Sequence, residues 1–453
     1  MEDTIAAIST PVGESGIAII RISGPLALTA ADRIFHSRTG CPSGFPSHTI
    51  HFGTVGTNGD TIDQVMLTVM RAPRTYTKED TVEINCHGGV LTARKLLSLC
   101  LQNGARLAEP GEFTKRAFLN GRIDLAQAEA VMDIIRARTD RAHQCAVHEL
   151  QGRLSNRVDE ARERLISILA HIEAHIDFPE EDISPNNREN LLRETKAVFN
   201  QLRSLLATFR EGRILRDGLP VAIIGRPNVG KSSLLNALLG ENRAIVTPIP
   251  GTTRDTLEEY VNIGGIPFRF TDTAGIRRPR GRVESMGVER ATQAVEKSDV
   301  VLLVLDGSQP FRPADLEIQE KCGTKPVLLI LNKADLPNRL RIPKELCHMR
   351  SVSVSALTGL GVCSLCDSLL DIAHSGICAG TNFTVAINER HHEVLVRATD
   401  ALTSGVQLFE RGDELELICQ QLRIALNAVG EITGKTATED ILQRVFSTFC
   451  VGK

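Results

Sequence analysis

The stretch Gly225-Arg-Pro-Asn-Val-Gly-Lys-Ser232 decides the fold of the central part of the chain. It follows a strand-like run at 221–224 and precedes a helix-like run at 233–239. In this G-x-x-x-x-G-K-[ST] pattern, glycines let backbone N–H groups surround phosphate oxygens at a helix N-terminus. We expect Lys231 to reach the β- and γ-phosphates and the Ser232 hydroxyl to bind Mg²⁺. A glycine-rich turn without a ligand is the alternative, but the flanking strand and helix favour phosphate binding.

Three further motifs follow in the order that a guanine-nucleotide-binding domain requires. Asp272-Thr-Ala-Gly275 suits the carboxylate on the Mg²⁺ side and the sensor of the γ-phosphate. In Asn332-Lys-Ala-Asp335 the final carboxylate can accept hydrogen bonds from N1–H and the 2-amino group of guanine, a donor pair that adenine lacks. Ser355-Ala-Leu357 fits the loop that reaches the guanine carbonyl through backbone N–H groups. The sequence therefore predicts a GTPase.

The region around these motifs, 218–377, alternates buried strands with helices. Such a βαβ pattern predicts a mostly parallel sheet that is covered on both faces, as in a P-loop GTPase domain. The strand-like runs are 221–224, 268–271, 300–305, 327–331 and 351–354.

The regions on either side of this domain have different secondary-structure patterns. Residues 1–120 alternate short β-rich and helical runs with Gly and Pro at the joins, which predicts a small α+β domain. Helical periodicity over 121–217 and again over 378–453 predicts two parts of one all-α helical domain. We therefore expect a multidomain α/β protein in which the GTPase domain is inserted into the helical domain.

Several local features belong to the helical parts. The apolar period runs from 124 to 176, and a loop at 177–185 interrupts it. Thr436-Ala-Thr-Glu439 reads as a capping box for a last helix that reaches Phe449. After this helix, Cys450 has either a chemical role or a packing role beside the phenylalanines, and packing is favoured.

Composition limits the class of protein. A chain of 453 residues suggests two to four domains, and its net charge of -3 neither indicates nor excludes nucleic-acid binding. The 11 cysteines, the acidic start without an apolar leader and the absence of a long apolar run predict a cytoplasmic protein in a reducing compartment, away from membranes. Cys363 and Cys366 stand without a second pair, so core packing is favoured over metal binding.

Hydrolysis needs a group that orients the attacking water. Ras carries a Gln directly after the second motif, but this chain has Ile276, and an apolar side chain cannot orient water. Glu284 is the candidate, although the local pattern alone favours a solvated charge in a loop. An arginine finger cannot be assigned, because a solvated loop face is favoured for the nearby Arg277, Arg278, Arg280 and Arg282 over a finger or a contact with RNA or a partner.

The chain as a whole resembles the MnmE (TrmE) family of tRNA-modification GTPases. The resemblance rests on segments from both ends and the middle: Ala18-Ile-Ile-Arg-Ile-Ser-Gly24, His87-Gly-Gly89, Arg116-Ala-Phe-Leu-Asn-Gly-Arg-Ile-Asp-Leu-Ala-Gln-Ala-Glu-Ala130, Ile176-Asp-Phe-Pro179, Gly251-Thr-Thr-Arg-Asp255 and Phe449-Cys-Val-Gly-Lys453.

This resemblance implies a tetrahydrofolate-binding and dimerisation domain at 1–120, with 5-formyl- or methylene-tetrahydrofolate contacted by Arg21, Glu83, Arg122 and Lys453. It implies a homodimer that forms a heterotetramer with an FAD flavoprotein of the MnmG type. Together they would add an aminomethyl-type (carboxymethylaminomethyl) group to C5 of the wobble uridine of certain tRNAs. Glycine or ammonium would supply the amino group.

The resemblance also implies how GTP is hydrolysed. A K⁺ ion held between two paired GTPase domains would supply the positive charge of the missing finger, and Glu284 would position the water. The implied K⁺ ligands are Asn228, Thr247, Ile249 and Thr252, and the Mg²⁺ ligands are Ser232 and Thr253. The residues expected around GTP are Asn228, Val229, Gly230, Lys231, Ser232, Ser233, Thr247, Pro248, Ile249, Pro250, Gly251, Thr252, Thr253, Asp272, Thr273, Ala274, Gly275, Asn332, Lys333, Ala334, Asp335, Ser355, Ala356 and Leu357.

Two other classes of function remain open on the GTPase domain alone. One is a GTPase of the ribosome-assembly type without modification activity. The other is a folate-dependent one-carbon enzyme whose GTPase domain is only regulatory. The N-terminal domain and the Cys-Val-Gly-Lys ending argue against the first class.

Overall fold

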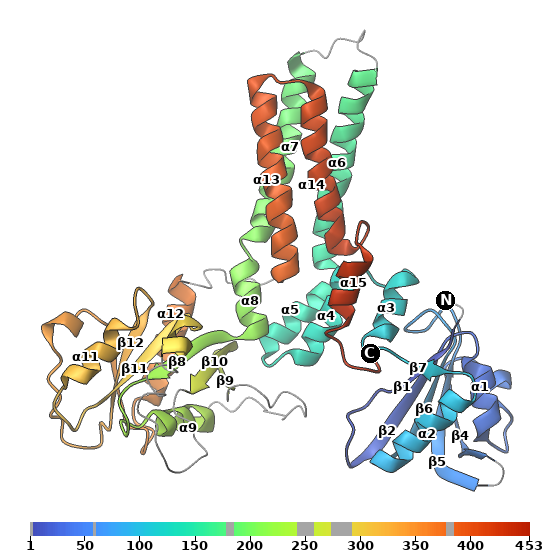
Figure 1. Cartoon of the computed structure of the whole chain (residues 1–453), viewed down its shortest axis with the longest axis horizontal. Coiled ribbons are helices and arrows are strands. Elements are labelled where there is room, and N and C mark those ends of the chain that lie inside the picture. The colour runs from blue at the N-terminus through green and yellow to red at the C-terminus, as the bar shows by residue number, and fades with distance from the viewer. Residues whose placement is uncertain (1–2, 58–59, 178–184, 242–257, 273–291, 377–384) are drawn as a thin grey trace. The chain divides into compact units, whose positions relative to one another are not determined.

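The computed structural model describes residues 3–57, 60–177, 185–241, 258–272, 292–376 and 385–453 (Figure 1). The chain forms two compact units. The first comprises Met1–Met132, Ser155–Ile166 and Arg423–Lys453, and the second comprises Asp133–Leu154 and Ser167–Leu422.

The first unit contains a seven-stranded sheet in the order β3-β4-β5-β6-β2-β1-β7. Its strands are β1 (Ile5–Ile8), β2 (Ser15–Ser23), β3 (Phe35–His36), β4 (Thr49–Thr57), β5 (Asp60–Met70), β6 (Thr81–Gly88) and β7 (Arg106–Leu107). All neighbouring strands are antiparallel except β1 and β7. Helices α1 (Ala27–Ile34) and α2 (Val90–Gln102) and the 3-10 turn η1 (Pro42–Gly44) complete the predicted α+β fold.

Alternation along the strands gives this sheet two different faces. Ile20, Leu67 and Ile84 are fully buried in one core with apolar residues of α1 and α2. Residues of the opposite parity, such as Phe52 and Met66, remain exposed. Helices α1 and α2 therefore cover one face of this mostly antiparallel sheet, while the other face is exposed at β4 and β5 but buried at β1, where Ile5 and Ala7 pack with Phe113.

A second cluster in the first unit joins α3 (Glu112–Leu119), α4 (Leu125–Arg136) and α15 (Glu439–Phe446). Asp124 and Gln127 form a capping box at the start of α4, because each side chain accepts the other residue's backbone N–H. The predicted capping box at Thr436 is wrong: Thr438 occupies the N-cap without a side-chain cap, and the Thr436 hydroxyl donates to the Asn427 carbonyl. The last helix also ends at Phe446, short of the predicted Phe449.

The helical part is more divided than its apolar period predicts. The single run expected over 124–176 is three helices, α4, α5 (Asp140–Leu150) and α6 (Arg153–Asp177). Thr139 caps α5 by accepting the Ala142 N–H, and Gly152, with a φ of 83°, interrupts the helical conformation between α5 and α6. The apolar spacing continues across both breaks, which is why periodicity alone did not reveal them.

The remaining long helices are α7 (Pro185–Leu206), α8 (Phe209–Asp217), α13 (Glu389–Arg411) and α14 (Leu415–Thr433). Helices α7 and α13 run side by side (Figure 1). Gly405 of α13 faces α14, where an added Cβ would make an ordinary van der Waals contact with the Leu422 side chain at 3.6 Å. Of the predicted loop at 177–185, residues 178–184 lie outside the described part of the chain.

The second unit contains a six-stranded sheet in the order β13-β12-β11-β8-β10-β9. Its strands are β8 (Leu219–Ile224), β9 (Glu258–Ile263), β10 (Ile266–Asp272), β11 (Val300–Asp306), β12 (Val327–Asn332) and β13 (Ser351–Val354). Only β9 is antiparallel to its neighbour, through a tight hairpin at Gly264 and Gly265, both with positive φ. The mostly parallel sheet predicted from the sequence is confirmed.

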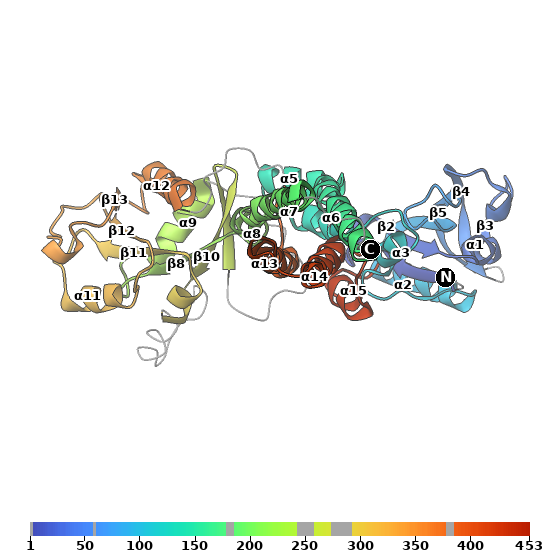
Figure 2. The same cartoon turned by 90° about the horizontal axis from the view of Figure 1, so that it is seen from above.

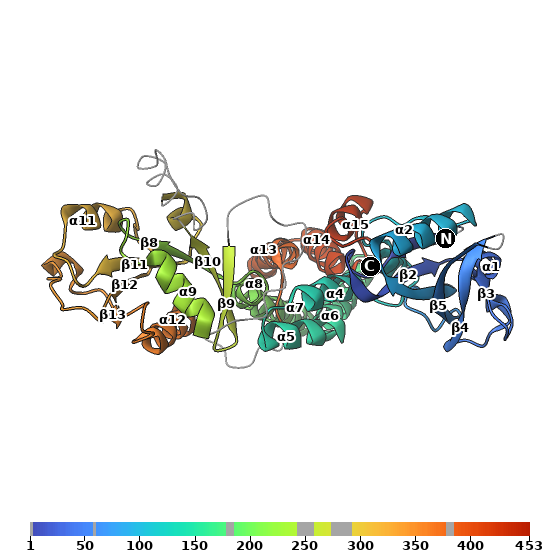
Figure 3. The same cartoon turned by 90° about the horizontal axis from the view of Figure 1, so that it is seen from below.

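Helices cover both faces of this sheet, as the βαβ pattern predicts. Figures 2 and 3 show α9 (Lys231–Glu241) and α12 (Val362–Gly376) on one side and α11 (Pro313–Glu320) on the other. A 3-10 turn, η2, spans Lys344–Leu346. Cys366 packs in the core beneath α12 whereas Cys363 is exposed.

The described residues contain neither a cluster of metal-binding side chains nor a membrane-spanning helix. No group of three or more His, Cys, Asp or Glu side chains among them could hold a metal ion. None of the helices that they form has the length and apolar character needed to cross a membrane.

Candidate functional site

The predicted nucleotide-binding motifs meet at one edge of the six-stranded sheet. The phosphate-binding loop follows β8, Asp272 ends β10, Asn332 ends β12, and Ser355 follows β13. These four strands are parallel, so their carboxyl ends lie at the same edge, where ligands bind in open α/β sheets. The structure thus brings together motifs that are more than a hundred residues apart.

The phosphate-binding loop depends on its glycines. A Cβ on Gly225 would lie 2.4 Å from the Val304 carbonyl oxygen, and one on Gly230 would lie 2.2 Å from Asn332 Nδ2. Asn228 is exposed and has a φ of 63°, a conformation that Asn tolerates better than most residues. The loop therefore passes too close to β11 and to Asn332 for any residue with a side chain at these two positions.

The Lys231 side chain points back over the loop that precedes it. Its Nζ donates to the carbonyls of Gly225 and Arg226, each at 2.8 Å. Ser232 and Ser233 occupy the next positions in the first turn of α9, where the helix dipole favours negative charge. The ammonium is therefore held within reach of the loop that we expect to hold phosphates.

Asn332 connects the phosphate-binding loop with the guanine-side loops. Its Nδ2 donates to the Val229 carbonyl at 2.8 Å, and its Oδ1 accepts the Ala356 N–H at 3.1 Å. Beyond it, the Ser355 hydroxyl donates to Asp335 Oδ1 at 2.5 Å. One carboxylate oxygen of Asp335 is thus oriented by protein, which leaves the other for a base.

Ion pairs fix the surroundings of these loops. Lys333 Nζ lies 2.6 Å from Asp306 Oδ2, and Arg226 Nε lies 2.6 Å from the buried Asp315 carboxylate. Burial would raise the pKa of Asp306, but hydrogen bonds from Lys333 and Ser308 outweigh it and lower the pKa of that carboxyl. Asp306 is therefore an ionised anchor for the third motif.

Part of the predicted nucleotide site lies outside the described residues. This part comprises the candidate base Glu284 and the predicted ligands Thr247, Pro248, Ile249, Pro250, Gly251, Thr252, Thr253, Thr273, Ala274 and Gly275. Their roles stay predictions.

A cavity of ≈ 180 Å³ lies in the first unit and contains three of the four residues predicted to contact folate. Arg21 of β2 and Glu83 of β6 are cross-strand neighbours, and Arg21 Nε donates to Glu83 Oε1 at 2.7 Å. Lys453 lines the same cavity. The fourth residue, Arg122, lies over the ring of Tyr76, another lining residue, at 4.6 Å from its centroid.

The chain's last residues are fixed beside this cavity by backbone contacts. The Gly452 carbonyl accepts hydrogen bonds from Ser9 Oγ at 3.2 Å and Arg21 at 3.4 Å, and the Lys453 carbonyl accepts the Phe113 N–H at 3.1 Å. Gly452 has a φ of 95°, and a Cβ there would lie 2.5 Å from the Ile8 carbonyl oxygen. Lys453 is consequently delivered to a defined place.

The chain's last residues and the cavity each differ from the sequence expectations in one respect. Cys450 is exposed, so the favoured packing role for its side chain is wrong; Phe446 and Phe449 fill the core without it. Sequence reasoning also missed four lining residues, which no motif marks and which converge only through tertiary packing: Met70, Tyr76, Thr81 and Val131.

Comparisons with known proteins agree on one family. The family model described as the MnmE helical domain matches residues 125–450. The family model described as the GTP-binding protein TrmE N-terminus matches residues 4–122. The tRNA modification GTPase MnmE of Geobacter sulfurreducens is 49% identical over 100% of both chains. The protein of the same description from Geobacillus thermodenitrificans is 48% identical over 100% of this chain and 99% of its own length. The one from Bacillus subtilis is 45% identical over 100% of both chains.

Proposed function

Because this chain belongs to the MnmE family of tRNA modification GTPases, we propose that its GTP hydrolysis drives a base modification at the tRNA wobble position. The proposed reaction adds a carboxymethylaminomethyl-type group to C5 of the wobble uridine, together with an FAD flavoprotein of the MnmG type. A tRNA substrate makes the cytoplasm the proposed compartment. The proposed division is a folate-binding domain at 1–120, helical parts at 121–217 and 378–453, and a GTPase domain at 218–377.

The cavity of the first unit is the observation that carries this proposal. A folate has amide and amino N–H donors on its pterin ring and carboxylates on its glutamate tail. The Glu83 carboxylate is an acceptor held by Arg21, and the Lys453 and Arg122 side chains supply positive charge. This mixture of one acceptor and several cations suits 5-formyl- or methylene-tetrahydrofolate as the one-carbon donor.

The geometry of the nucleotide edge supports the proposed hydrolysis chemistry. Ser232 and Thr253 would hold Mg²⁺, which neutralises charge on the β- and γ-phosphates. Asn228, Thr247, Ile249 and Thr252 would hold K⁺ at the interface of two GTPase domains. Asn228 is exposed beside the phosphate-binding loop, as a ligand shared across such an interface must be.

A homodimer is proposed through the open face of the first unit's sheet. On this face Phe52 of β4 lies opposite Met66 of β5, with exposures of 63% and 44%, and Ile50 is exposed by 59%. Large apolar side chains that neighbour one another on an uncovered sheet face favour association. We propose that two such dimerised chains and two flavoprotein subunits make a heterotetramer.

The test is mass spectrometry of wobble uridines in cells with and without this protein, combined with folate binding by the purified chain. Loss of the modified uridine on deletion, together with folate binding, supports the proposal. A GTPase of the ribosome-assembly type predicts unchanged wobble uridines and no folate binding. A folate enzyme with a regulatory GTPase domain predicts folate binding with unchanged wobble uridines.

A further inference from the structure

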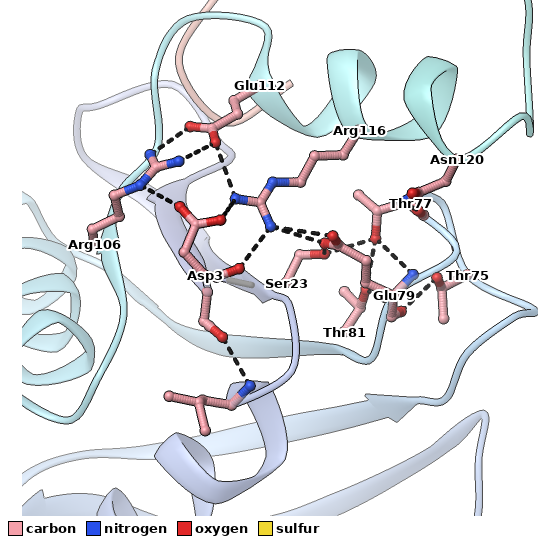
Figure 4. A network of polar contacts seen from close by, with 12 residues as sticks. Asp3, Ser23, Thr75, Thr77, Glu79, Thr81, Arg106, Glu112, Arg116 and Asn120 are labelled. Atoms are coloured by element: carbon pink, nitrogen blue, oxygen red, sulfur yellow. Dashed lines mark hydrogen bonds and ion pairs between the residues drawn. The ribbon is translucent and has the colours of Figure 1, made fainter. Parts of the chain in front are cut away.

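Arg116 of α3 has a fully buried side chain that meets three carboxylates (Figure 4). One terminal nitrogen donates to the Asp3 carbonyl at 2.9 Å and to both Glu79 carboxylate oxygens at 3.2 Å. The other donates to Asp3 Oδ1 at 2.9 Å and to Glu112 Oε1 at 3.1 Å. A single planar guanidinium thus ties together the start of the chain, the loop after β5 and the first turn of α3.

The loop that Arg116 holds forms part of the cavity wall. It connects β5 with β6 and carries Tyr76, while Thr81 follows directly at the start of β6. Within the loop, the Thr75 hydroxyl donates to the Glu79 carbonyl at 2.7 Å. The position of Glu79 therefore sets the position of the segment that places Tyr76.

Two further contacts attach this loop to the same helix. Tyr76 Oη lies 3.0 Å from Thr114 Oγ1, and Asn120 Nδ2 donates to the Thr77 carbonyl at 2.6 Å. Thr114 precedes Arg116 in α3, and Asn120, which Figure 4 labels, is the C-cap residue of the helix. The ion pair with Glu79 lies between these two contacts and joins two charged side chains, and Lys78 Nζ adds a hydrogen bond to the Gly121 carbonyl at 2.9 Å.

Helix α3 also holds the opposite wall and the fourth predicted ligand-binding residue. The Phe113 N–H in its first turn donates to the Lys453 carbonyl. After the helix, the Arg122 N–H donates to the Ala117 carbonyl at 2.9 Å. Both walls of the cavity are therefore hydrogen-bonded to residues in α3 or directly after it.

We propose that Arg116 is a positioning residue for the ligand cavity, which sets the distance between the wall formed by Tyr76 and the wall formed by Lys453. Its own side chain is fully buried and is not one of the residues that line the cavity. A buried ion network contributes little net stability compared with apolar packing, so its value lies in the single geometry that it imposes. The proposal rests on the proposed folate site for the identity of the ligand.

Substitution of Arg116 by Lys separates charge from geometry. Lys keeps the positive charge, but its single ammonium cannot reproduce the hydrogen bonds that the two terminal guanidinium nitrogens make to Asp3, Glu79 and Glu112. Arg106→Lys is the matched control. Arg106 binds the same Asp3 and Glu112 carboxylates and is 47% exposed, but it makes no hydrogen bond to the loop that carries Tyr76.

The readout uses the chain's own composition. It contains only two tyrosines, Tyr76 and Tyr260 of β9, so 3-fluorotyrosine labelling gives two ¹⁹F signals. We expect Arg116→Lys to shift or broaden the Tyr76 signal and to leave the Tyr260 signal unchanged. Arg106→Lys is expected to leave both signals near their wild-type positions. An unchanged Tyr76 signal in folded Arg116→Lys protein overturns the proposal.

Titration with 5-formyl-tetrahydrofolate measures the effect of each substitution on ligand affinity. We expect Arg116→Lys to weaken affinity about tenfold, the effect of about one charge-assisted hydrogen bond, and Arg106→Lys to stay within about twofold. Equal affinities of Arg116→Lys and wild type overturn the proposal.

If the wild-type chain does not bind the folate, the proposed function fails, and the Tyr76 signal alone decides the role of Arg116. If Arg116→Lys does not fold, Glu79→Gln replaces it, because this change weakens the same ion pair and keeps an oxygen for the Ser23 hydroxyl, which donates to Glu79 at 2.8 Å. A wild-type Tyr76 signal in Glu79→Gln then counts against the proposal.

Discussion

The nucleotide edge of the second unit and the cavity of the first unit are assembled in different ways. At the nucleotide edge, each contribution is a short contiguous motif that directly follows a parallel strand. In the cavity, single residues come from β2, β5, β6, a loop, α4 and the chain's end. In a parallel sheet, motifs that each follow a strand meet at the same edge, so short local segments are enough to form a site there. The cavity instead requires tertiary contacts that hold distant residues in place.

The largest expected effect concerns the nucleotide edge. Glu284→Ala should keep GTP affinity and reduce hydrolysis by about 10²- to 10⁴-fold, the range for a lost general acid–base group, since Ile276 cannot orient water. Single-turnover hydrolysis in K⁺ buffer, with Ile276→Val as a control for disturbance of the loop, measures the effect. Undiminished turnover in Glu284→Ala would contradict the role of Glu284. The next residues to substitute would then be Arg277, Arg278, Arg280 and Arg282.

The second effect concerns base choice at the same edge. Asp335→Asn removes the acceptor for two guanine donors, so GTP affinity should fall by about 10²-fold, the equivalent of about one to two charge-assisted hydrogen bonds. The same variant should gain affinity for xanthosine triphosphate, whose 2-oxo group needs a donor. Competition binding with both nucleotides measures the change. Wild-type preference in the variant would show that base recognition does not depend on this carboxylate.

The contrast between the two regions explains what the sequence could predict. Each nucleotide motif is contiguous and lies beside its own strand, so the edge of the sheet follows from the βαβ order. The ends of α4 and α5 were missed because the apolar spacing continues past Thr139 and Gly152, while capping and a positive φ break the helices. The capping box at Thr436 failed because its hydroxyl has a tertiary partner, Asn427. Local patterns fail where a tertiary contact competes with them.

The cavity was predictable only through family resemblance. Arg21 and Glu83 alone would have been interpreted as surface charges at strand ends, and nothing in the local sequence marks Tyr76. The network around Arg116 joins residues more than a hundred positions apart, so no spacing rule reveals it. Charge neutralisation of a buried guanidinium is a property of the folded chain.

The third effect tests the chain's end. Removal of residues 450–453 deletes the Lys453 ammonium and one wall of the cavity, so folate affinity should fall at least about tenfold. GTP binding and hydrolysis should remain, because the nucleotide edge belongs to the other unit. Isothermal titration with the folate and with GTP measures both. The variant Lys453→Ala retains the backbone contacts and isolates the ammonium, and normal folate affinity in the truncated protein would exclude the tail from the site.

The smallest expected effect comes from a residue adjacent to Arg116. Lys115 Nζ lies 2.8 Å from Glu439 Oε1 at the start of α15, and the two side chains are 25% and 72% exposed. Water already solvates such a pair and salt screens it, so the pair contributes less than about 1 kcal/mol. Glu439→Gln should therefore leave folate affinity within about twofold, even though it removes a connection between α3 and α15.

A double-mutant cycle of Glu439→Gln and Lys115→Met measures this pair directly by chemical unfolding. The cycle is needed because Glu439 also lies in the first turn of α15, where a negative charge favours the helix dipole by about 0.3–1 kcal/mol on its own. A coupling free energy below about 1 kcal/mol is expected. If Glu439→Gln instead weakened folate binding tenfold, exposed contacts would position the cavity as strongly as the buried network, and the special role assigned to Arg116 would be lost.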